Sequence, residues 1–262
     1  MSPSKSQPSL VIYRGFPERD TYVWSPFVTK LEAQLRFAGA SYTYETGSTR
    51  LAPRGKIPYI ALKHDGGEPE LLGDSQLISE RLVREGVLSK LNESLSPVEN
   101  TLDMGIKALL EDKLYFYNTH ERWNENYYTM RDKILAALPY PIRAAVGIMI
   151  WRNINAGLYG QGTGRFTPDE IHTFRDRIWD NIENLLADAR RKAGVKSGPF
   201  WIFGGDQPAE CDFSVFAFTI GCLICKAGPE SAKKVRSLPS VIDYARRIHE
   251  QYFSDYTGPE WE

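Results

Sequence analysis

The chain has 262 residues, of which 42% are hydrophobic and 25% charged, and its formal net charge at pH 7 is −1. This composition is that of a globular protein with room for one large or two modest domains, and the charge gives no electrostatic reason to expect a nucleic acid or an anionic membrane as partner. No apolar run reaches the about 18 residues that a membrane span requires. Residues 1–9 are polar and lack the apolar core of a signal peptide, so we expect a cytoplasmic protein.

The first predicted elements are a strand and a helix. Residues 10–16 form a compact apolar run, which predicts a buried strand. Residues 26–38 carry apolar side chains at helical spacing, with a proline in the first turn and Gly39 after the end. Ser25 therefore lies at a helix N-cap, where free amides and the helix dipole favour an anion. Its hydroxyl could help keep a bound thiol ionised; the alternative is that Ser25 is a plain cap.

Further strands and a second helix follow. Residues 41–45 alternate tyrosine with polar residues, which is typical of a strand, and residues 53–60 form a turn-rich stretch that leads into an apolar run. Residues 70–72 can form one more short strand. Asp74 and Ser75 then begin a helix. The predicted order is β-α-β, a turn with proline, and β-β-α.

Helical periodicity dominates the rest of the chain. Residues 89–96 are polar and suit a connection between domains. Beyond them strand patterns are scarce, and a capping box at Thr167 begins one of several helices. We therefore predict a first domain over residues 9–90 and an all-helical domain over residues 97–253.

The cysteines and histidines argue against two kinds of chemistry. None of the cysteines (Cys211, Cys222 and Cys225) lies at the start of the first helix, so dithiol exchange and a mixed disulfide with the enzyme have no nucleophile there. Cys222 and Cys225 form a C-x-x-C pair inside an apolar segment, and we expect them to be buried thiols. The four histidines are scattered without metal-ligand spacing, so no metal site is predicted.

Three motifs, in this order, resemble those of the soluble glutathione transferases. They are Ser25-Pro26-Phe27, Gly55-Lys56-Ile57-Pro58 and Asp74-Ser75. The resemblance implies an α+β thioredoxin-like N-terminal domain that binds glutathione, followed by an all-α C-terminal helical-bundle domain that forms the acceptor side. Within this superfamily, the chain resembles the failed-axon-connections and metaxin-like branch more closely, through residues 25–36, 53–60 and 161–166.

Residues 200–212 add an independent match to the same superfamily, in which a buried helix begins with Ser/Thr-x-x-Asp. Asp212 occupies the acidic position, but Ala209 stands where the capping hydroxyl is usual. An alanine cannot accept the amide hydrogen bond, a loss of about 1 kcal/mol, and we expect Asp212 to accept amides of its own first turn instead. The motif is interpreted as structural.

The resemblance implies a role for each residue of the N-terminal motifs. Asp74, Ser75 and the following amides would hold the γ-glutamyl end of glutathione at a helix N-terminus. Ile57, before a cis Pro58, would pair with the cysteinyl unit, and Lys56 would pair with the glycyl carboxylate. Each has a plainer alternative: Asp74 and Ser75 as helix caps, Pro58 as a fold element, and Lys56 as a solvated turn lysine.

Activation of the thiol has more than one candidate. Ser25 comes first, because one hydrogen bond from a hydroxyl to a thiolate is worth about 1.5–3 kcal/mol. Tyr13 could act instead, although we expect a core or edge tyrosine there. Residues 17–24 form a longer loop than is usual in the superfamily, and its Tyr22 and Trp24 could line the acceptor pocket.

The expected function is glutathione-dependent conjugation or isomerisation of a small hydrophobic electrophile, with the glutathione thiolate as nucleophile, as in detoxification or secondary metabolism. The alternative is a glutathione-transferase-like binding or scaffold protein without significant turnover. The expected partners are glutathione and a small hydrophobic acceptor, without nucleic acid or membrane span. Both a monomer and a homodimer agree with the sequence.

Overall fold

The computed structural model describes residues 8–194 and 197–262, so most of the polar segment 1–9 lies outside the described residues. Its N-terminal part contains a four-stranded sheet of order β2-β1-β3-β4, in which β1 is parallel to β2 and antiparallel to β3, and β3 is antiparallel to β4. The strands are β1 (Ser9–Tyr13), β2 (Thr43–Glu45), β3 (Tyr59–Lys63) and β4 (Glu70–Gly73).

The register of the sheet brings three separate segments to one edge. Tyr13 pairs with Tyr59, and Tyr59 pairs with Gly73. The end of β1, the start of β3 and the end of β4 are therefore neighbours. The Ile57–Pro58 peptide bond just before β3 is cis, as the resemblance implies.

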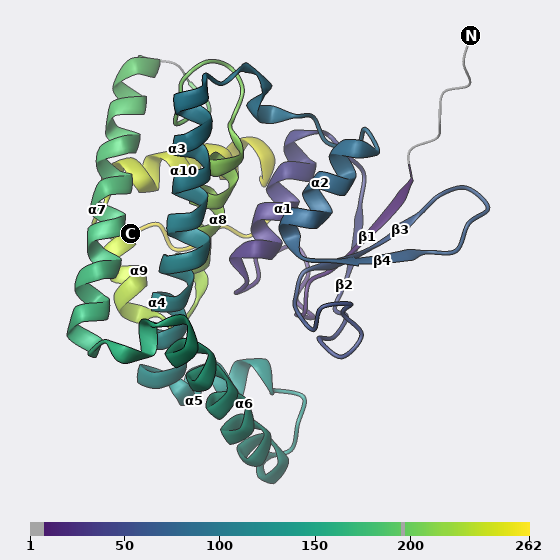
Figure 1. The fold of residues 1–262 in the computed structure, drawn as a ribbon, viewed down its shortest axis with the longest axis vertical. Coiled ribbons are helices and arrows are strands. Elements are labelled where there is room, and N and C mark those ends of the chain that lie inside the picture. The colour runs from purple at the N-terminus through teal and green to yellow at the C-terminus, as the bar shows by residue number, and fades with distance from the viewer. Residues whose placement is uncertain (1–7, 195–196) are drawn as a thin grey trace.

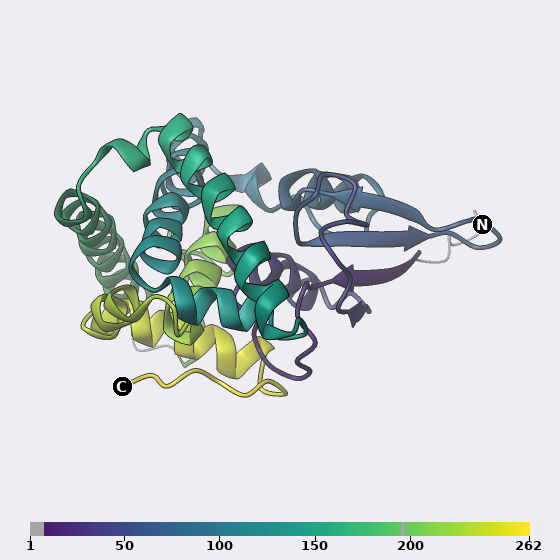
Figure 2. The same cartoon turned by 90° about the horizontal axis from the view of Figure 1, so that it is seen from below.

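Helices α1 (Pro26–Phe37) and α2 (Ser75–Arg84) lie between the sheet and the helical part (Figures 1 and 2). Leu31 and Leu35 of α1 and Ile78 of α2 are fully buried in the core beneath the sheet. The other side of α1 packs against the helical part, so α1 is buried along most of its length. This position explains why α1 contains buried charged residues.

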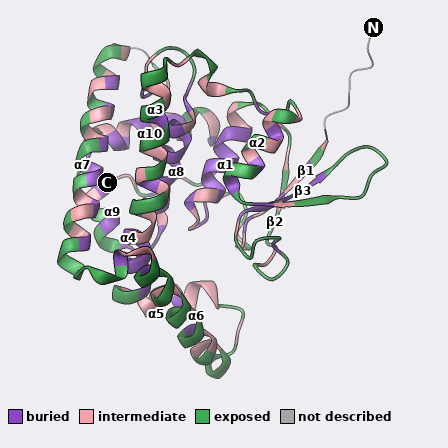
Figure 3. Ribbon diagram, viewed as in Figure 1, coloured by how far each residue is buried: buried purple, intermediate pink, exposed green. Residues whose placement is uncertain are grey.

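The remainder of the described chain is helical. It comprises η1 (Leu91–Ser94), α3 (Pro97–Leu109), η2 (Leu110–Leu114), α4 (Tyr115–His120), η3 (Glu121–Glu125), α5 (Tyr127–Ile134), α6 (Tyr140–Gln161), η4 (Thr163–Arg165), α7 (Pro168–Ala193), α8 (Glu210–Ile224), α9 (Pro229–Arg236) and α10 (Pro239–Tyr252). Segments η1 and η4 are 3₁₀ turns, whereas η2 and η3 are π-helical. Helix α8 is the buried centre of this part (Figure 3).

The architecture confirms the predicted fold class, a thioredoxin-like N-terminal domain followed by a helical remainder. The domain limits 9–90 and 97–253 stay predictions. Within the described ranges, no helix combines the length and the apolar character that a membrane crossing needs.

Asp212 stabilises the start of α8, but not through the predicted contacts. One of its carboxylate oxygens accepts the backbone amide of Ala209 (2.8 Å), and the other accepts the amide of Ile202 (3.0 Å) and the hydroxyl of Tyr244 (2.8 Å). The expectation that Asp212 accepts amides of its own first turn is therefore wrong. The carboxylate instead joins the preceding loop to α8 and α10. Burial raises the pKa of Asp212 to about 7.

Candidate functional site

Ser25 occupies the N-cap of α1, as the sequence predicts, but its side chain makes no capping hydrogen bond. Its carbonyl accepts the amides of Val28 (3.2 Å) and Thr29 (3.4 Å). The half-buried hydroxyl has no hydrogen-bond partner in the part of the chain that the structure describes. Pro26 has no N–H, and the amides of Val28 and Thr29 already donate to the Ser25 carbonyl. The hydroxyl of Ser25 and the amide of Phe27 therefore remain available to a ligand.

The helical part fixes the start of α1. Arg122 of η3 donates to the carbonyl of Trp24 (3.3 Å) and to the carbonyl of Gly221 in α8 (3.1 Å). The ring of Phe27 packs against Tyr115, with ring centroids 5.2 Å apart. No local sequence pattern indicates this role of Arg122, because a lone arginine in a helical segment usually faces solvent.

The cis-proline turn lies beside the start of α2. A Cβ on Gly73 would lie 3.5 Å from the backbone nitrogen of Arg54, so the turn that precedes Pro58 folds over the end of β4. Ile57 is half-buried, whereas Lys56 is exposed and has no ion-pair partner among residues 8–194 and 197–262. The structure therefore brings the second and third predicted motifs together.

Asp74 has a backbone conformation that a residue other than glycine rarely adopts, with φ 78° and ψ 119°. One oxygen of its carboxylate accepts the amides of Gln76 (3.0 Å) and Leu77 (3.2 Å). Asp74 itself thus occupies these two amides in this structure, and their expected role toward a ligand stays a prediction. Ser75 is 8% exposed, and its hydroxyl has no partner within the described chain.

The spacing of the two serines matches the length of a tripeptide. Ser79 of α2 donates to the side-chain oxygen of Gln34 in α1 (2.7 Å), which places these two positions side by side. Counting back along both helices puts Ser75 about 7–8 Å further along the helix axis than Ser25. With helices about 8–10 Å apart, the two residues are separated by about 12 Å, close to the roughly 10 Å of an extended tripeptide.

Tyr13 is held in the sheet edge by its neighbours. Its ring stacks on that of Tyr59, with centroids 4.3 Å apart and an angle of 9° between the planes. Burial, with a further contribution from Glu45, raises the pKa of Tyr13. The phenol therefore keeps its proton at pH 7, as both a sheet tyrosine and a donor to a thiolate would, so both predictions for Tyr13 remain.

The long loop before α1 is only partly as predicted. Tyr22 is 5% exposed and packs in the helical core, where its hydroxyl is 2.9 Å from Nδ1 of His249. The prediction that Tyr22 lines an acceptor pocket is wrong, because the loop folds inward at this residue. Trp24 is half-exposed, and the ammonium of Lys133 in α5 lies 5.7 Å from its ring centroid. Lys133 also pairs with Glu18.

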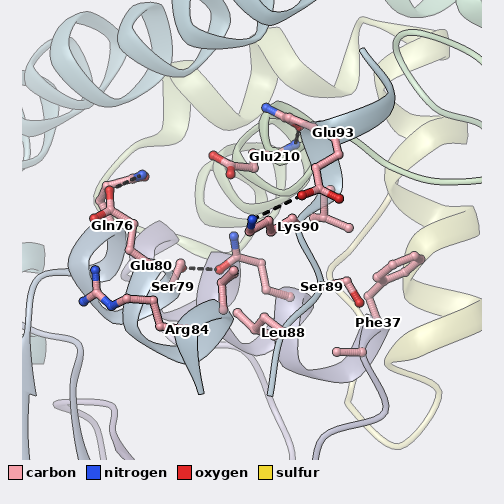
Figure 4. A pocket seen from close by; sticks show the side chains of 15 residues that line it. Phe37, Gln76, Ser79, Glu80, Arg84, Leu88, Ser89, Lys90, Glu93 and Glu210 are labelled. Atoms are coloured by element: carbon pink, nitrogen blue, oxygen red, sulfur yellow. Dashed lines mark hydrogen bonds and ion pairs between the residues drawn. The ribbon is translucent and has the colours of Figure 1, made fainter. Parts of the chain in front are cut away.

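A cavity of about 440 Å³ lies between the end of α1, the length of α2 from Gln76 to Arg84 and the connection that follows α2 (Figure 4). Phe37 and Leu88 contribute apolar surface, and Lys90 pairs with Glu93 at 3.2 Å. The predicted site residues are absent from its lining. The cavity begins at Gln34, about 13 Å along α1 from Ser25.

The cysteines are buried and free, as expected. Burial raises the pKa of Cys222 to about 12, so this thiol is not a nucleophile at neutral pH. The described residues contain no group of three histidine, cysteine or acidic side chains that could hold a metal ion.

Known proteins resemble this chain in sequence and in fold. A model of the glutathione S-transferase N-terminal domain matches residues 26–130. The isoprene-epoxide–glutathione S-transferase of Rhodococcus sp. (strain AD45) is 27% identical over 236 residues, which cover 87% of this chain and 92% of that protein.

Solved structures show the same fold at lower identity. The glutathione transferase GSTFuA2 of Phanerochaete chrysosporium is 15% identical with a TM-score of 0.58, covering 94% of this chain and 99% of that one. The β-etherase LigF of Sphingobium sp. strain SYK-6 is 14% identical with a TM-score of 0.55 and the same coverage. The chain is thus similar to glutathione S-transferases in sequence, through the family model and the relative from Rhodococcus, and it shares their fold.

Proposed function

We propose that this chain is a glutathione-dependent transferase in which the glutathione thiolate attacks a small hydrophobic electrophile. One observation carries the proposal: the hydroxyls of Ser25 and Ser75, which have no partner in the described structure, stand at the starts of two neighbouring helices beside a cis-proline turn. Their spacing of roughly 12 Å, counted along the helices, is close to the length of a tripeptide. A cap hydroxyl without a hydrogen bond does not stabilise its helix, and this loss is expected where a ligand supplies the missing hydrogen bond.

In the proposed complex, glutathione lies along the sheet edge from α2 to α1. The hydroxyl of Ser75 donates to the γ-glutamyl carboxylate, and the carboxylate oxygen of Asp74 that caps no amide accepts from the ammonium group. The backbone of Ile57, turned by Pro58, pairs with the cysteinyl unit, and Lys56 neutralises the glycyl carboxylate.

Ser25 then acts on the thiol. Its hydroxyl and the amide of Phe27 donate to the sulfur, which favours the thiolate over the thiol and lowers the pKa of bound glutathione below about 8.5. The thiol proton leaves to solvent. The positive end of the α1 dipole adds to this effect.

The electrophile that we propose to test first is a small epoxide, because the Rhodococcus relative is named for isoprene epoxide. The sulfur–carbon bond forms as a carbon–oxygen bond of the ring breaks, and the released alkoxide takes a proton from water. The acceptor would lie between the half-buried ring of Tyr115 and the loop that carries Trp24.

Sequence motifs alone support two finer proposals. Residues 25–36, 53–60 and 161–166 favour the failed-axon-connections and metaxin-like branch. The second proposal, from the sequence pattern, is that the chain divides into one domain over residues 9–90 and another over residues 97–253.

Calorimetric titration with glutathione, followed by conjugation assays with epoxides and other electrophiles, tests the proposed function. Ser25→Ala should leave glutathione affinity largely intact, lower the conjugation rate by about one to two powers of ten and shift the pH–rate profile upward. Ser96→Ala, which removes a serine cap in the helical part, is the matched control and should leave the rate unchanged.

The outcomes separate the alternatives. A rate unchanged by Ser25→Ala but abolished by Tyr13→Phe would assign the chemistry to the tyrosine. Glutathione binding without turnover on any electrophile would favour the binding or scaffold protein. A folded chain that does not bind millimolar glutathione would refute the proposed function.

A further inference from the structure

Arg122 of η3 is a buried cation without a counterion. Its side chain is 7% exposed, and it forms no ion pair with any residue in the described ranges. Two of its nitrogens donate to the carbonyls of Trp24 and Gly221, whereas Nε has no hydrogen-bond partner among the same residues. Buried charges in proteins are ordinarily paired, because an unpaired charge loses its hydration without compensation. An unpaired buried guanidinium is therefore expected where its positive charge has a function.

The carboxylate next to Arg122 in sequence is directed to other partners. Glu121 pairs with Arg175 of α7 (3.1 Å) and accepts the backbone amides of Glu230 (2.9 Å) and Ser231 (3.2 Å) at the start of α9. The other titratable side chains close enough to act on Arg122 are a phenol and two thiols, those of Tyr115, Cys222 and Cys225. No acidic side chain of the described chain therefore lies within ion-pair distance of this guanidinium.

Arg122 lies directly behind the start of α1. The carbonyl of Trp24, which accepts from Nη1 at 3.3 Å, belongs to the peptide bond that joins Trp24 to Ser25. The carbonyl of Gly221 in α8 accepts from Nη2 at 3.1 Å, and a Cβ on Gly221 would lie 3.4 Å from Pro26. By way of the Trp24 carbonyl, a sulfur hydrogen-bonded to Oγ of Ser25 would be at most about 12 Å from the guanidinium.

We propose that the unpaired charge of Arg122 stabilises the glutathione thiolate at Ser25, an inference that rests on the proposed function. Other charged side chains near the start of α1 form ion pairs, Lys30 with Glu111 and Lys133 with Glu18. A positive charge favours the ionised form of a nearby thiol, and burial protects this effect from screening by salt. At about 12 Å and an effective dielectric constant of about 20, one charge lowers the pKa of a thiol by about 1.

A thiol of the chain itself already responds to this charge. Burial raises the pKa of Cys222 to about 12, and the charge of Arg122 is the largest contribution that opposes this rise. The glutathione sulfur differs from Cys222, because in the proposed complex it receives hydrogen bonds from the hydroxyl of Ser25 and the amide of Phe27. The same charge can therefore help to keep the glutathione sulfur ionised near neutral pH.

A purely structural role for Arg122 predicts a different pattern among variants. The guanidinium also holds the loop before α1 against α8 through its two hydrogen bonds. Arg122→Gln keeps one donor group but removes the charge, whereas Arg122→Lys keeps the charge and loses the planar fork that reaches both carbonyls. A loss of hydrogen bonds would affect both variants, whereas a loss of charge affects Arg122→Gln alone.

The ultraviolet absorbance of the thiolate measures the ionisation of bound glutathione without any electrophile. Spectra of the full chain with saturating glutathione are recorded across the neutral pH range, and spectra with S-methylglutathione, which has no thiol, are subtracted. Arg122→Gln should raise the pKa of the bound thiol by about 1, and Arg122→Lys should raise it by less than about 0.5. Below both pKa values, Arg122→Gln should also lower the conjugation rate about tenfold with little change in the KM for glutathione.

Arg143 provides a matched control. Like Arg122, it donates to two backbone carbonyls, those of Ala136 (3.1 Å) and Leu138 (2.9 Å), but both lie in the connection that leads into α6. Arg143→Gln should leave the pKa of the bound thiol unchanged. Circular dichroism shows whether each variant is folded. If Arg122→Gln does not fold, Ser25→Ala is the second test: it retains Arg122, so its bound thiol should still ionise below the about 8.5 of a free thiol.

Three results would overturn the inference: a pKa of the bound thiol that is unchanged in Arg122→Gln or raised equally in Arg122→Lys, a rise in Arg143→Gln as large as that in Arg122→Gln, or a bound thiol in Ser25→Ala that ionises no more readily than free glutathione. In each of these cases glutathione still binds, so the proposed function stands without a role for the charge of Arg122. A folded chain that binds no glutathione would refute the proposed function and this inference with it.

Discussion

Alanine substitutions at two helix N-caps should show which serine stabilises the fold and which one is available to a ligand. At Ser96 the cap of α3 is complete: the side chain accepts the amide of Glu99 (3.3 Å), and the Glu99 carboxylate accepts the amide of Ser96 (2.8 Å). At Ser25 no such bond exists. Ser96→Ala should therefore lower the free energy of unfolding by about 1 kcal/mol, whereas Ser25→Ala should change it by less than about 0.5 kcal/mol.

The assay is urea denaturation at pH 7, followed by far-ultraviolet circular dichroism and by tryptophan fluorescence. Agreement of the two probes justifies a two-state analysis of each variant. Saturating glutathione should stabilise the unmodified chain and Ser25→Ala to a similar extent, because the serine acts on the thiol more than on affinity. A loss at Ser25→Ala equal to that at Ser96→Ala would show that Ser25 is a plain cap and would refute the reasoning.

Three further predictions concern the ligand, the buried acid and the thiols. Ser75→Ala should weaken glutathione binding in calorimetry by about 1–3 kcal/mol, because a charged ligand group loses a donor; unchanged affinity would contradict the proposed site. The pKa of Asp212 is raised from 3.8 to about 7, so between these pH values the folded chain holds a proton that the unfolded chain has released. The free energy of unfolding should therefore fall as the pH rises through this range. Asp212→Asn should flatten this pH dependence in urea denaturation at several pH values. Cys222 and Cys225 should react slowly with an alkylating reagent in the native chain, and rapid labelling would contradict their burial.

The elements of the fold were predictable because their signals are local. Pro26 in the first turn of α1 and the capping box at Thr167 fix two helix starts from adjacent residues alone. The cis geometry before Pro58 was predictable only by resemblance, because most proline peptide bonds in folded proteins are trans.

The contacts that shape the site were not predictable, because they join residues far apart in the chain. Tyr22 follows the same loop as Trp24, yet it turns into the core because His249 and other C-terminal residues meet it there. The cap at Asp74, by contrast, joins residues only two and three apart, and the sequence offered it as the alternative to a ligand role. Composition and periodicity do not report such long-range or conformational effects.

The position of Ser25 depends on both parts of the molecule, and this explains the buried charges on α1. Lys30, one helical turn beyond the start of α1, is 2% exposed and pairs with Glu111 of η2 at 2.7 Å. The hydroxyl of Ser214 in α8 donates to the same carboxylate oxygen (2.7 Å). An isolated buried ammonium is strongly unfavourable, so α1 can pack against the helical part in few orientations other than the one that satisfies Lys30. The pair thus orients α1 from one side while Arg122 holds the preceding loop from the other, and together they fix the position of Ser25 at the start of α1.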